Sequence, residues 1–287
     1  MKAETVALLH PGNMGATVGA AAKAGGARVV WASRGRSGAT RERAERAGLI
    51  DVGDLPTALA QSAAVLSICP PHAALGVARE VAQAKFQGIY VDANAVSRAT
   101  AEEIGRIVTE AGARFIDGGI IGSPVKQAGT TRLYLSGVGA ERIAELFSGT
   151  LLDARAIGDQ PGAASALKLA YAAWTKCSDV LAIAIRAYAN HEGVDAALLE
   201  EWAISQPALA KKCDRAASVA VPKAWRYVGE MQEIADAFKS AGLPGGFHDA
   251  AAELCQQLVC FKDQTDSPPS IATVLQVLAG KPEGEDR

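Results

Sequence analysis

The sequence has few aromatic residues, almost no net charge and no long apolar run. Phe, Trp and Tyr together make up 5% of its 287 residues, and the formal net charge is −2. A dedicated nucleic-acid-binding protein is usually basic or carries a basic stripe, and neither feature is present. No apolar run approaches the ~20 residues that a membrane-spanning helix needs. We therefore expect neither a nucleic acid nor a membrane among its partners.

Cysteine is scarce as well. The five cysteines are an odd number and include no Cys-x-x-Cys pair, so neither a disulfide framework nor a zinc site is expected. The apolar stretch behind Glu4 is too short for the core of a signal peptide but has the length of a first strand. We expect a soluble, cytoplasmic protein that holds no metal ion.

What is present is the composition of a folded protein, with 49% hydrophobic and 21% charged residues. The length suits one large domain or two ordinary ones. In the first half of the chain, short apolar runs rich in β-branched residues alternate with Ala-rich helical segments, which predicts βαβ units and a parallel sheet. The candidate strands are residues 5–10, 27–32, 65–69, 88–92, 114–118 and 132–137.

The pattern changes at Pro161, after which no strand signal appears. Residues 163–190 predict one long helix, because they contain no Pro and no Gly. Further helices are predicted at residues 195–205, 208–219, 223–240 and 249–265. We expect a Rossmann-type, doubly wound α/β domain over residues 1–160. An all-helical substrate and dimerisation domain over residues 161–280 and a charged tail over residues 281–287 would follow.

A glycine turn follows the first predicted strand directly. Gly12 and Gly15 match the second and third glycines of a Gly-x-Gly-x-x-Gly turn, and His10 stands where the first would be. The second glycine lets the backbone approach a diphosphate, and the amides of Asn13 and Met14 at the helix start would face the anion. A glycine pair in such a turn is more often structural, but its place at the first strand–helix junction favours a nucleotide.

The end of the second strand indicates which nucleotide. An NAD site would offer an acid there for the ribose 2′-hydroxyl, and the sequence offers none. Ser33, Arg34, Arg36 and Ser37 suit a 2′-phosphate instead, because guanidinium binds phosphate through charge-assisted, forked hydrogen bonds. The alternative is an ordinary solvated basic loop. We expect NADP(H).

The long helix carries a lysine, although much of the rest of the helix is apolar. Ser165, Lys168, Tyr171 and Asp179 share one face by the i, i+3, i+4 rule. Lysine is rarely buried without a task or a partner. In the simpler interpretation Lys168 reaches solvent or pairs with an acid such as Asp179; in the other it is an acid–base catalyst whose pKa burial would lower.

Taken together, these motifs resemble those of the β-hydroxyacid dehydrogenase superfamily, which includes 3-hydroxyisobutyrate and 6-phosphogluconate dehydrogenases and imine reductases. The resemblance covers nearly the whole chain at four places in the expected order. These are Gly12-Asn13-Met14-Gly15, Asp92-Ala93-Asn94-Ala95-Val96-Ser97, the run from Phe115 to Ser123, and Gly162 with Lys168. Asn94 replaces a family serine, Ile121-Gly122-Ser123 replaces Ser-Gly-Gly, and Ala172 replaces an asparagine.

The resemblance implies roles for particular residues. Lys168 would be the catalytic acid–base, with Asn94 orienting it or binding substrate and cofactor, and Tyr171 is the alternative proton donor. Gly122 and Ser123 would offer substrate an amide and a hydroxyl.

Two loop residues complete the predicted site. Pro70 would shape the cofactor loop near the nicotinamide ribose, and His248 lies in a glycine-flanked loop, a kind of segment that is often mobile and functional. Because the long helix is apolar nearly all round, it needs more than one covering surface. A homodimer would supply one, as the resemblance also implies.

Three functions remain open on the sequence. The first is an NADPH-dependent oxidoreductase that transfers hydride between the nicotinamide and a small carbonyl or β-hydroxy acid. The second is an imine reductase acting on a cyclic or secondary imine, which the apolar Ile121 favours and the retained Lys168 disfavours. The third is an NADPH-binding module without catalysis. The substrate and the direction of the reaction are not determined by the sequence.

Overall fold

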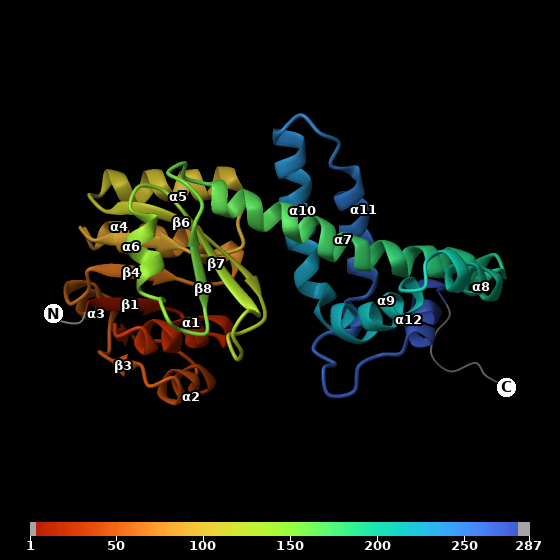
Figure 1. The fold of residues 1–287 in the computed structure, drawn as a ribbon, viewed down its shortest axis with the longest axis horizontal. Helices are drawn as coiled ribbons and strands as arrows, with labels where there is room; N and C mark the ends of the chain where they lie inside the picture. Colours follow the sequence, from red (N-terminus) through yellow and green to blue (C-terminus); the bar gives the residue numbers. More distant parts are fainter. Residues whose placement is uncertain (1–3, 281–287) are drawn as a thin grey trace. The chain divides into compact units, whose positions relative to one another are not determined.

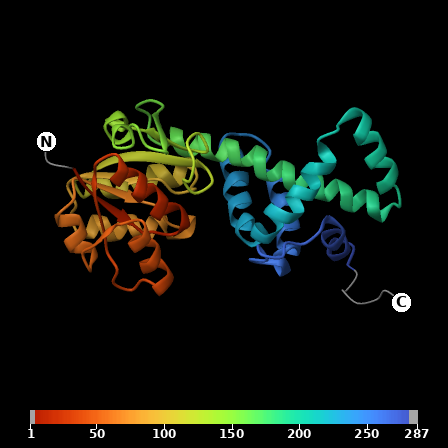
Figure 2. The same cartoon turned by 60° about the horizontal axis from the view of Figure 1, so that its bottom comes forward.

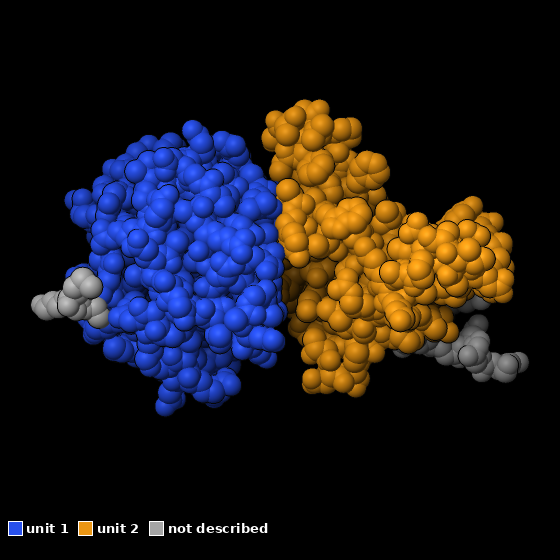
Figure 3. Space-filling view, in the orientation of Figure 1, with its two compact units in different colours: residues 1–169 blue, residues 170–287 orange. Residues whose placement is uncertain are grey.

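The computed structural model of the chain describes residues 4–280, so the predicted charged tail, residues 281–287, lies outside the described part. The chain divides into two compact units, Met1–Leu169 and Ala170–Arg287 (Figure 3). The first unit is α/β and the second is helical (Figure 1). No helix between residues 4 and 280 is long and apolar enough to span a bilayer.

The first unit is built on one eight-stranded sheet with the strand order β3-β2-β1-β4-β5-β6-β7-β8. The strands are β1 (Thr5–Leu9), β2 (Arg28–Trp31), β3 (Ile50–Asp51), β4 (Ala64–Ser67), β5 (Ile89–Asp92), β6 (Arg114–Gly122), β7 (Thr131–Ser136) and β8 (Asp153–Ala156). The order in which β1 lies between β2 and β4 is that of a Rossmann sheet. The predicted doubly wound fold is therefore confirmed.

One part of the sheet differs from the prediction. Strands β1 to β6 are parallel, but β7 runs antiparallel to β6, and β8 is parallel to β7. The sheet is therefore mixed, with one antiparallel pair that the predicted parallel sheet did not include. The reason is that β6 continues to Gly122, which leaves residues 123–130 as the only connection to β7. A parallel crossover needs a dozen or more residues.

Helices cover both faces of the sheet. They are α1 (Asn13–Ala24), α2 (Gly38–Arg46), α3 (Leu55–Ala60), η1 (Pro71–Ala73), α4 (Ala74–Gln83), α5 (Arg98–Glu110) and α6 (Ala140–Glu145). Val6 and Leu8 belong to a core that includes Val18 of α1, whereas Leu9 belongs to a second core with Ile104 of α5. This alternation along β1 is expected of a strand whose two faces are both buried.

The long predicted helix is α7 (Ala163–His191), which begins in the first unit and ends in the second. The helices that follow are α8 (Asp195–Ser205), α9 (Leu209–Arg215), α10 (Ala224–Ser240), α11 (Gly246–Gln257) and α12 (Ile271–Leu278); Figure 2 shows them from a second side. Two predicted helical segments are divided in the structure. The segment predicted over 208–219 is helical as expected, but it consists of α9 followed by a π-helical turn, Ala216–Ala220. The helix predicted over 249–265 ends at Gln257 and is followed by the short helix η4 (Val259–Phe261).

Candidate functional site

The glycine turn lies at the point where the strand order of the sheet reverses. Strand β1 is paired with β2 on one side and with β4 on the other. In open α/β sheets, ligands bind outside the carboxyl ends of the strands at such a switch point. The turn after β1 and the Cys69–Pro70 loop after β4 both lie at this switch point.

The turn has an unusual backbone at His10. His10 has a φ of 66°, in the left-handed region that glycine adopts most easily. A Cβ added at Gly15 would lie 2.6 Å from the His10 carbonyl oxygen, so only glycine fits where α1 packs on the turn. A Cβ added at Gly12 would meet only that oxygen, at 4.0 Å. Gly15 is needed for packing, whereas Gly12 faces open space.

These observations fit a bound dinucleotide. Gly12 is the N-cap of α1 and has no side chain that could cap the helix, so the first amides of α1 are available to an anion. The open space in front of Gly12 would admit a diphosphate at the backbone. Asn13 and Met14 form the first helical turn, as predicted.

The four residues predicted to hold a 2′-phosphate have different partners. Arg34 is exposed and pairs with Asp54 at 3.2 Å. Ser37 is the N-cap of α2, where its hydroxyl accepts a hydrogen bond from the Thr40 amide at 3.3 Å. The half-buried Arg36 is close to the glycine turn, as its electrostatic effect on His10 shows.

The fourth residue, Ser33, lies beside Asp51, an acidic residue that the sequence analysis did not predict at this position. Asp51 at the end of β3 is paired in register with Trp31 of β2. Burial alone would raise the pKa of the Asp51 carboxyl group. Hydrogen bonds from Ser33 and Gly53 have the larger combined effect, so the pKa is lowered. The expectation that no acid stands near this strand end was wrong, because β3 brings one in from 18 positions after Ser33.

Arginines of α2 add positive charge that the sequence reading missed. Arg43 donates from Nε to the Pro11 carbonyl at 3.4 Å and from Nη2 to the Thr40 hydroxyl at 3.1 Å. It thereby ties α2 to the glycine turn. Arg41 donates to the Ser33 carbonyl at 3.4 Å. The sequence could have indicated this charge, because Arg41 and Arg43 belong to the helix that starts directly after the loop with Arg36.

Burial and charge keep the side chains near the turn neutral. Burial, followed by the nearby Arg36 guanidinium, lowers the pKa of His10 to about 4, so its imidazole is uncharged at neutral pH. Burial and the Asp92 carboxylate raise the pKa of the Cys69 thiol to about 12. Cys69 is therefore no thiolate nucleophile under ordinary conditions.

Asn94 is buried in a network at the ends of β4 and β5. Its Oδ1 accepts from the Cys69 amide at 2.6 Å, and its Nδ2 donates to Asp92 at 2.8 Å and to the Ser67 hydroxyl at 3.2 Å. The side chain is 3% exposed. Asn94 therefore holds the loop that leads to Pro70, and its predicted roles toward Lys168, substrate and cofactor stay predictions.

Asp92 and Asp117 are opposite each other in β5 and β6, and both are fully buried. Burial, and to a lesser extent the neighbouring Asp117 carboxylate, raise the pKa of Asp92 to about 7, although hydrogen bonds from Asn94 oppose the change. Asp92 thus titrates near neutral pH, close to the Asn94 network.

Asp117 holds the start of α7. Its carboxylate accepts from the Ser165 amide at 2.9 Å, the Ser165 hydroxyl at 2.5 Å and the Ser136 hydroxyl at 3.0 Å. Ser136 in turn accepts from the Ala164 amide at 3.0 Å. Two orphan amides at the N-terminus of α7 are satisfied in this way by groups from β6 and β7.

The same contact places Lys168. A Cβ added at Gly119 of β6 would lie 2.6 Å from the Ala164 carbonyl oxygen and 3.0 Å from the Lys168 Cβ. The absence of a side chain at Gly119 lets α7 pack directly on the strand. Lys168 is half-buried, and its Nζ donates to the Ile120 carbonyl oxygen. The face of α7 that carries Ser165 and Lys168 is therefore the face that docks on β6.

The predicted substrate residues lie where β6 ends. Gly122 has a φ of 121°, and an added Cβ would lie 2.2 Å from the Thr130 carbonyl oxygen, so glycine is required. Ser123 is exposed, and its carbonyl accepts from the Thr131 hydroxyl at 2.6 Å. Ile121 is 4% exposed and lies on the same face of β6 as Gly119.

Three residues considered in the sequence analysis belong to the helical unit. Tyr171 is 48% exposed, three residues after Lys168 on α7. Asp179 pairs with Arg215 at 3.3 Å and with Lys212 at 3.8 Å, which gives it partners other than the lysine considered for it. His248 is 5% exposed in the first turn of α11, with its ring edge-on to Phe238. The expectation of a glycine-flanked mobile loop there was wrong, because Gly246 already begins the helix.

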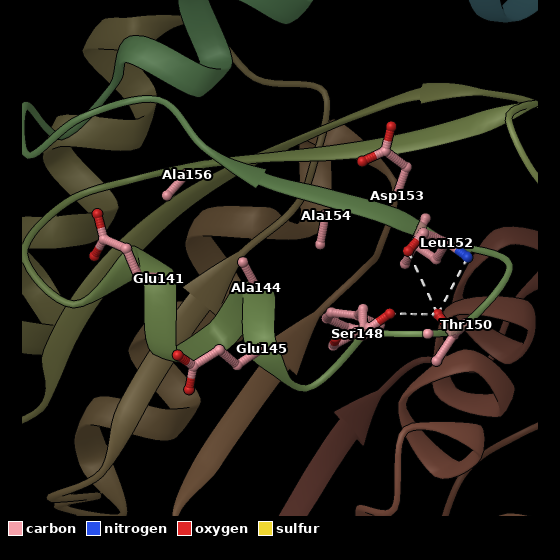
Figure 4. Close-up of a pocket in the computed structure, with 11 residues that line it drawn as sticks. Glu141, Ala144, Glu145, Ser148, Thr150, Leu152, Asp153, Ala154 and Ala156 are labelled. Carbon is pink, nitrogen blue, oxygen red and sulfur yellow. Dashed lines mark hydrogen bonds between the residues drawn. The ribbon is translucent and has the colours of Figure 1, made fainter.

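A hollow of about 520 Å³ lies elsewhere in the first unit, along α6 and the edge strand β8 (Figure 4). The Thr150 hydroxyl, which donates to the Phe147 carbonyl at 2.8 Å, holds the turn that borders it. None of the predicted site residues lines this hollow. The chemistry-bearing groups lie at the strand ends instead.

The comparisons with known proteins agree with the fold. A model described as a domain of unknown function, DUF1932, matches residues 189–258. An uncharacterized 28.5 kDa protein encoded in the 7S RNA 5′ region of Methanothermus fervidus is 31% identical over 169 residues. These residues make up 58% of this chain and 64% of that protein, so the match spans less than two thirds of the relative.

Three solved structures cover nearly the whole chain. The conserved protein MTH1747, of unknown function and described as similar to 3-hydroxyacid dehydrogenases, is 25% identical over 90% of this chain and 97% of its own, with a TM-score of 0.70. The Mycobacterium tuberculosis 3-hydroxyisobutyrate dehydrogenase with L-serine is 18% identical over 96% and 99%, with a TM-score of 0.70. The Myxococcus stipitatus imine reductase in complex with NADP+ is 19% identical over 96% and 99%, with a TM-score of 0.55. The chain thus has the fold of the 3-hydroxyacid dehydrogenases and imine reductases over nearly its whole length, with a DUF1932 domain in its helical part.

Proposed function

We propose that the protein is an NADPH-dependent oxidoreductase that transfers hydride between the nicotinamide and a small carbonyl or β-hydroxy acid. The observation that carries the proposal is the placement of Lys168. Ser136 and Asp117 cap the start of α7, and Gly119 lets the helix pack on β6, so Lys168 is held against this strand. The glycine turn that fits a dinucleotide belongs to the same unit. A lysine with a purely structural role would not need both the capped helix start and the glycine in the strand.

When bound, the cofactor would supply the hydride in reduction or accept it in oxidation, so the chain has only to bind and orient the reactants and move a proton. Gly12 and the first amides of α1 would hold the diphosphate, and Arg36 and Arg43 would meet the negative charge of the cofactor. The half-buried Lys168 would donate a proton to the substrate oxygen in reduction or accept one in oxidation. Tyr171 is the second candidate for that proton transfer.

The substrate class is proposed from the end of β6. Gly122 and Ser123 would offer polar contacts to a carbonyl or carboxyl group, while the Asn94 network keeps the Pro70 loop in place. Ile121 was the feature that favoured an imine substrate, but its side chain is buried. The structure of an imine reductase with NADP+ shares the fold, and a cyclic imine therefore remains the second substrate class to be assayed.

The test is an assay of the whole protein with NADPH and a panel of short semialdehydes, 2-keto and 3-keto acids and cyclic imines. Turnover is followed by the absorbance of NADPH. We expect turnover with a carbonyl compound and its loss, by about 100-fold or more, in Lys168→Met. NADPH binding, followed by fluorescence, should persist in this variant.

Each other outcome contradicts part of the proposal. Unchanged turnover in Lys168→Met would refute the role of the lysine. Turnover with imines alone would favour an imine reductase. Tight NADPH binding with no turnover on the panel would favour a non-catalytic NADPH-binding protein. We also propose a cytoplasmic location, which is consistent with five cysteines that are all unpaired in the structure.

A further inference from the structure

A row of buried polar residues crosses the sheet of the first unit. Ser67 of β4 is paired in register with Asp92 of β5, and Asp92 is paired with Asp117 of β6. Asp117 is in turn paired with Ser136 of β7. These four residues, which we call the polar row, are each 0% exposed. Since neighbouring strands lie about 5 Å apart and residues at one level point to the same face, the polar row sets two buried carboxyl groups side by side.

One half of the polar row fixes the Cys69–Pro70 loop. Asp92 accepts hydrogen bonds from the Asn94 amide at 3.2 Å and from Asn94 Nδ2 at 2.8 Å. Asn94 also donates from Nδ2 to the Ser67 hydroxyl at 3.2 Å, and its Oδ1 accepts from the Cys69 amide at 2.6 Å. A movement of the Asp92 carboxyl group is therefore passed to the first residue of the loop through a single side chain.

The other half of the polar row fixes the start of α7. Asp117 accepts from the amide and the hydroxyl of Ser165, and Ser136 accepts from the Ala164 amide. Ser165, like the polar row itself, is 0% exposed. Lys168 follows Ser165 by about one turn on the same face of the helix. The polar row therefore joins the loop after β4 to the helix that carries Lys168 within the buried interior.

Two carboxyl groups that are adjacent and buried repel each other strongly when both are ionised. Asp117 accepts three hydrogen bonds, from the Ser165 amide and from the hydroxyls of Ser165 and Ser136, which suits the ionised form. Burial, and then the Asp117 charge, raise the pKa of Asp92 to about 7, although hydrogen bonds from Asn94 oppose the change. Below neutral pH the pair therefore holds one proton, and the step in which it leaves belongs to both carboxyl groups.

The other titratable groups around Asp92 are a thiol and a phenol. Burial and the Asp92 carboxylate raise the pKa of Cys69 to about 12 and that of Tyr90 well above its usual value. Both side chains are therefore neutral around pH 7. From the opposite side, α7 brings a charged group to β6, the ammonium group of Lys168. Any test of the Asp92–Asp117 pair must therefore separate its titration from that of Lys168.

We propose that Asp92 and Asp117 share one proton and act as positioning residues that couple the Cys69–Pro70 loop to the start of α7. When the proton leaves, two negative charges stand side by side in the interior. Because each carboxyl group is hydrogen-bonded to its own partners, the repulsion is relieved by a shift of both the Asn94 contacts and the start of α7. The loop and the helix are thus held most firmly below pH 7 and are loosened together above it. The coupling depends on the fold alone, whereas its consequence for NADPH rests on the proposed function.

The first test is amide hydrogen exchange in the full chain without cofactor, followed by NMR spectroscopy between pH 5.5 and pH 8.5. The reporters are the Cys69 and Ser165 amides, one at each end of the connection. Relative to the intrinsic exchange rate at each pH, we expect the protection of both amides to fall about 10-fold, which corresponds to one pKa unit, with a common midpoint near pH 7. The Thr100 amide, which the Ser97 hydroxyl caps at 3.2 Å outside the polar row, is the internal control and should not change.

Four variants show which groups carry the response. In Asp92→Asn, whose amide replaces the protonated carboxyl group, the protection should not depend on pH. In Asp117→Asn the midpoint should move to lower pH, because the negative neighbour is gone. The matched control is Asp153→Asn, which changes a carboxylate on β8 of the same sheet outside the polar row. This control and Lys168→Met should both keep the wild-type midpoint. Circular dichroism establishes that each variant is folded.

The wild-type chain alone already tests the coupling, because two independent contacts would not lose protection at one midpoint. A change at one of the two amides without the other would overturn the coupling. A wild-type response that persists in Asp92→Asn, or one that disappears in Lys168→Met, would overturn the assignment of the proton to the carboxyl pair.

The second test is the affinity for NADPH as a function of pH, measured by fluorescence. Between pH 6 and pH 8.5 we expect the affinity of wild type to fall about 10-fold relative to Asp92→Asn, because the loosened loop lies at the switch point of the sheet. The ratio of the two proteins cancels the titration of the phosphate of the cofactor. An equal pH dependence in both proteins would overturn the link to the cofactor. No binding of NADPH at any pH would instead refute the proposed function, and the amide exchange result would still decide the coupling.

Discussion

Two arginines that stand two positions apart have different surroundings. Arg34 is exposed and its charge is matched by Asp54 at 3.2 Å, whereas Arg36 is half-buried and acts on His10 in the glycine turn. We expect Arg36→Ala to weaken NADPH binding by about 10-fold or more, because a charge-assisted hydrogen bond contributes about 1.5–3 kcal/mol. Arg34→Ala, the matched control, should change it less. Titration by fluorescence measures both, and an equal loss in the two variants would contradict the assignment of Arg36.

Asp92 predicts a pH dependence of stability. Its pKa is raised from 3.8 to about 7, mainly by burial, so between these values the folded state holds a proton that the unfolded state has lost. The contribution of Asp92 to the free energy of unfolding is fully present below pH 4 and is lost as the pH rises through 7. At ~1.4 kcal/mol per pKa unit the loss amounts to about 4 kcal/mol at most.

Asp92→Asn removes that titration while keeping the shape of the side chain. We expect the free energy of unfolding of wild type, relative to Asp92→Asn, to fall between pH 4 and pH 7. Denaturant unfolding at several pH values measures the difference between the two proteins, which cancels the effects of other titrating groups. A constant difference over this range would show that Asp92 is ionised throughout.

At the scale of elements, the contact between α7 and β6 depends on one glycine. In Gly119→Ala the new Cβ would lie 2.6 Å from the Ala164 carbonyl oxygen, so the helix start must move away from the strand. We expect a loss of stability of about 1–3 kcal/mol and, because Lys168 moves with the helix, lower turnover at unchanged NADPH affinity.

The matched control is Gly76→Ala in α4, where an added Cβ meets nothing within 4 Å. It should stabilise the protein by up to about 1 kcal/mol, since alanine is the better helix former. Thermal unfolding and the NADPH absorbance assay separate the two variants. Wild-type turnover in Gly119→Ala would show that α7 can dock in another way and still place Lys168.

The elements that the sequence predicted are those with a local signal. Apolar runs identified β1, β2, β4 and β5 to within one or two residues, and the helix without Pro or Gly identified α7. Strand β8 was missed because its sequence, Asp-Ala-Arg-Ala, is neither apolar nor β-branched. The hydrogen bond from Ser165 to Asp117 joins residues 48 positions apart, so no spacing rule indicates it.

The site shows the same limit. The glycine turn was predicted because Gly12 and Gly15 are close in sequence and directly follow a strand. The role of Asn94 was not, because its partners Ser67 and Cys69 come from the end of the neighbouring strand β4 and the loop that follows it, more than 20 residues earlier. Sequence patterns thus indicate which residue types are available, while the sheet register decides which of them meet.

At the scale of the whole molecule, α7 carries Lys168 near its start and exposes Trp174, Leu181 and Tyr188 in its remainder. If the homodimer expected from the sequence forms through these exposed side chains, the folded state is stabilised by mass action, so the midpoint of thermal unfolding must rise with protein concentration. We expect this rise for wild type and for the control Ile204→Asp, which changes a residue that is 81% exposed on α8, and a midpoint independent of concentration for Trp174→Asp combined with Leu181→Asp. Differential scanning calorimetry over a 100-fold range of concentration measures it. A wild-type midpoint that does not change with concentration would mean that pairing adds nothing to the stability of the fold, whereas the same rise in the double variant would place the interface on a surface other than α7.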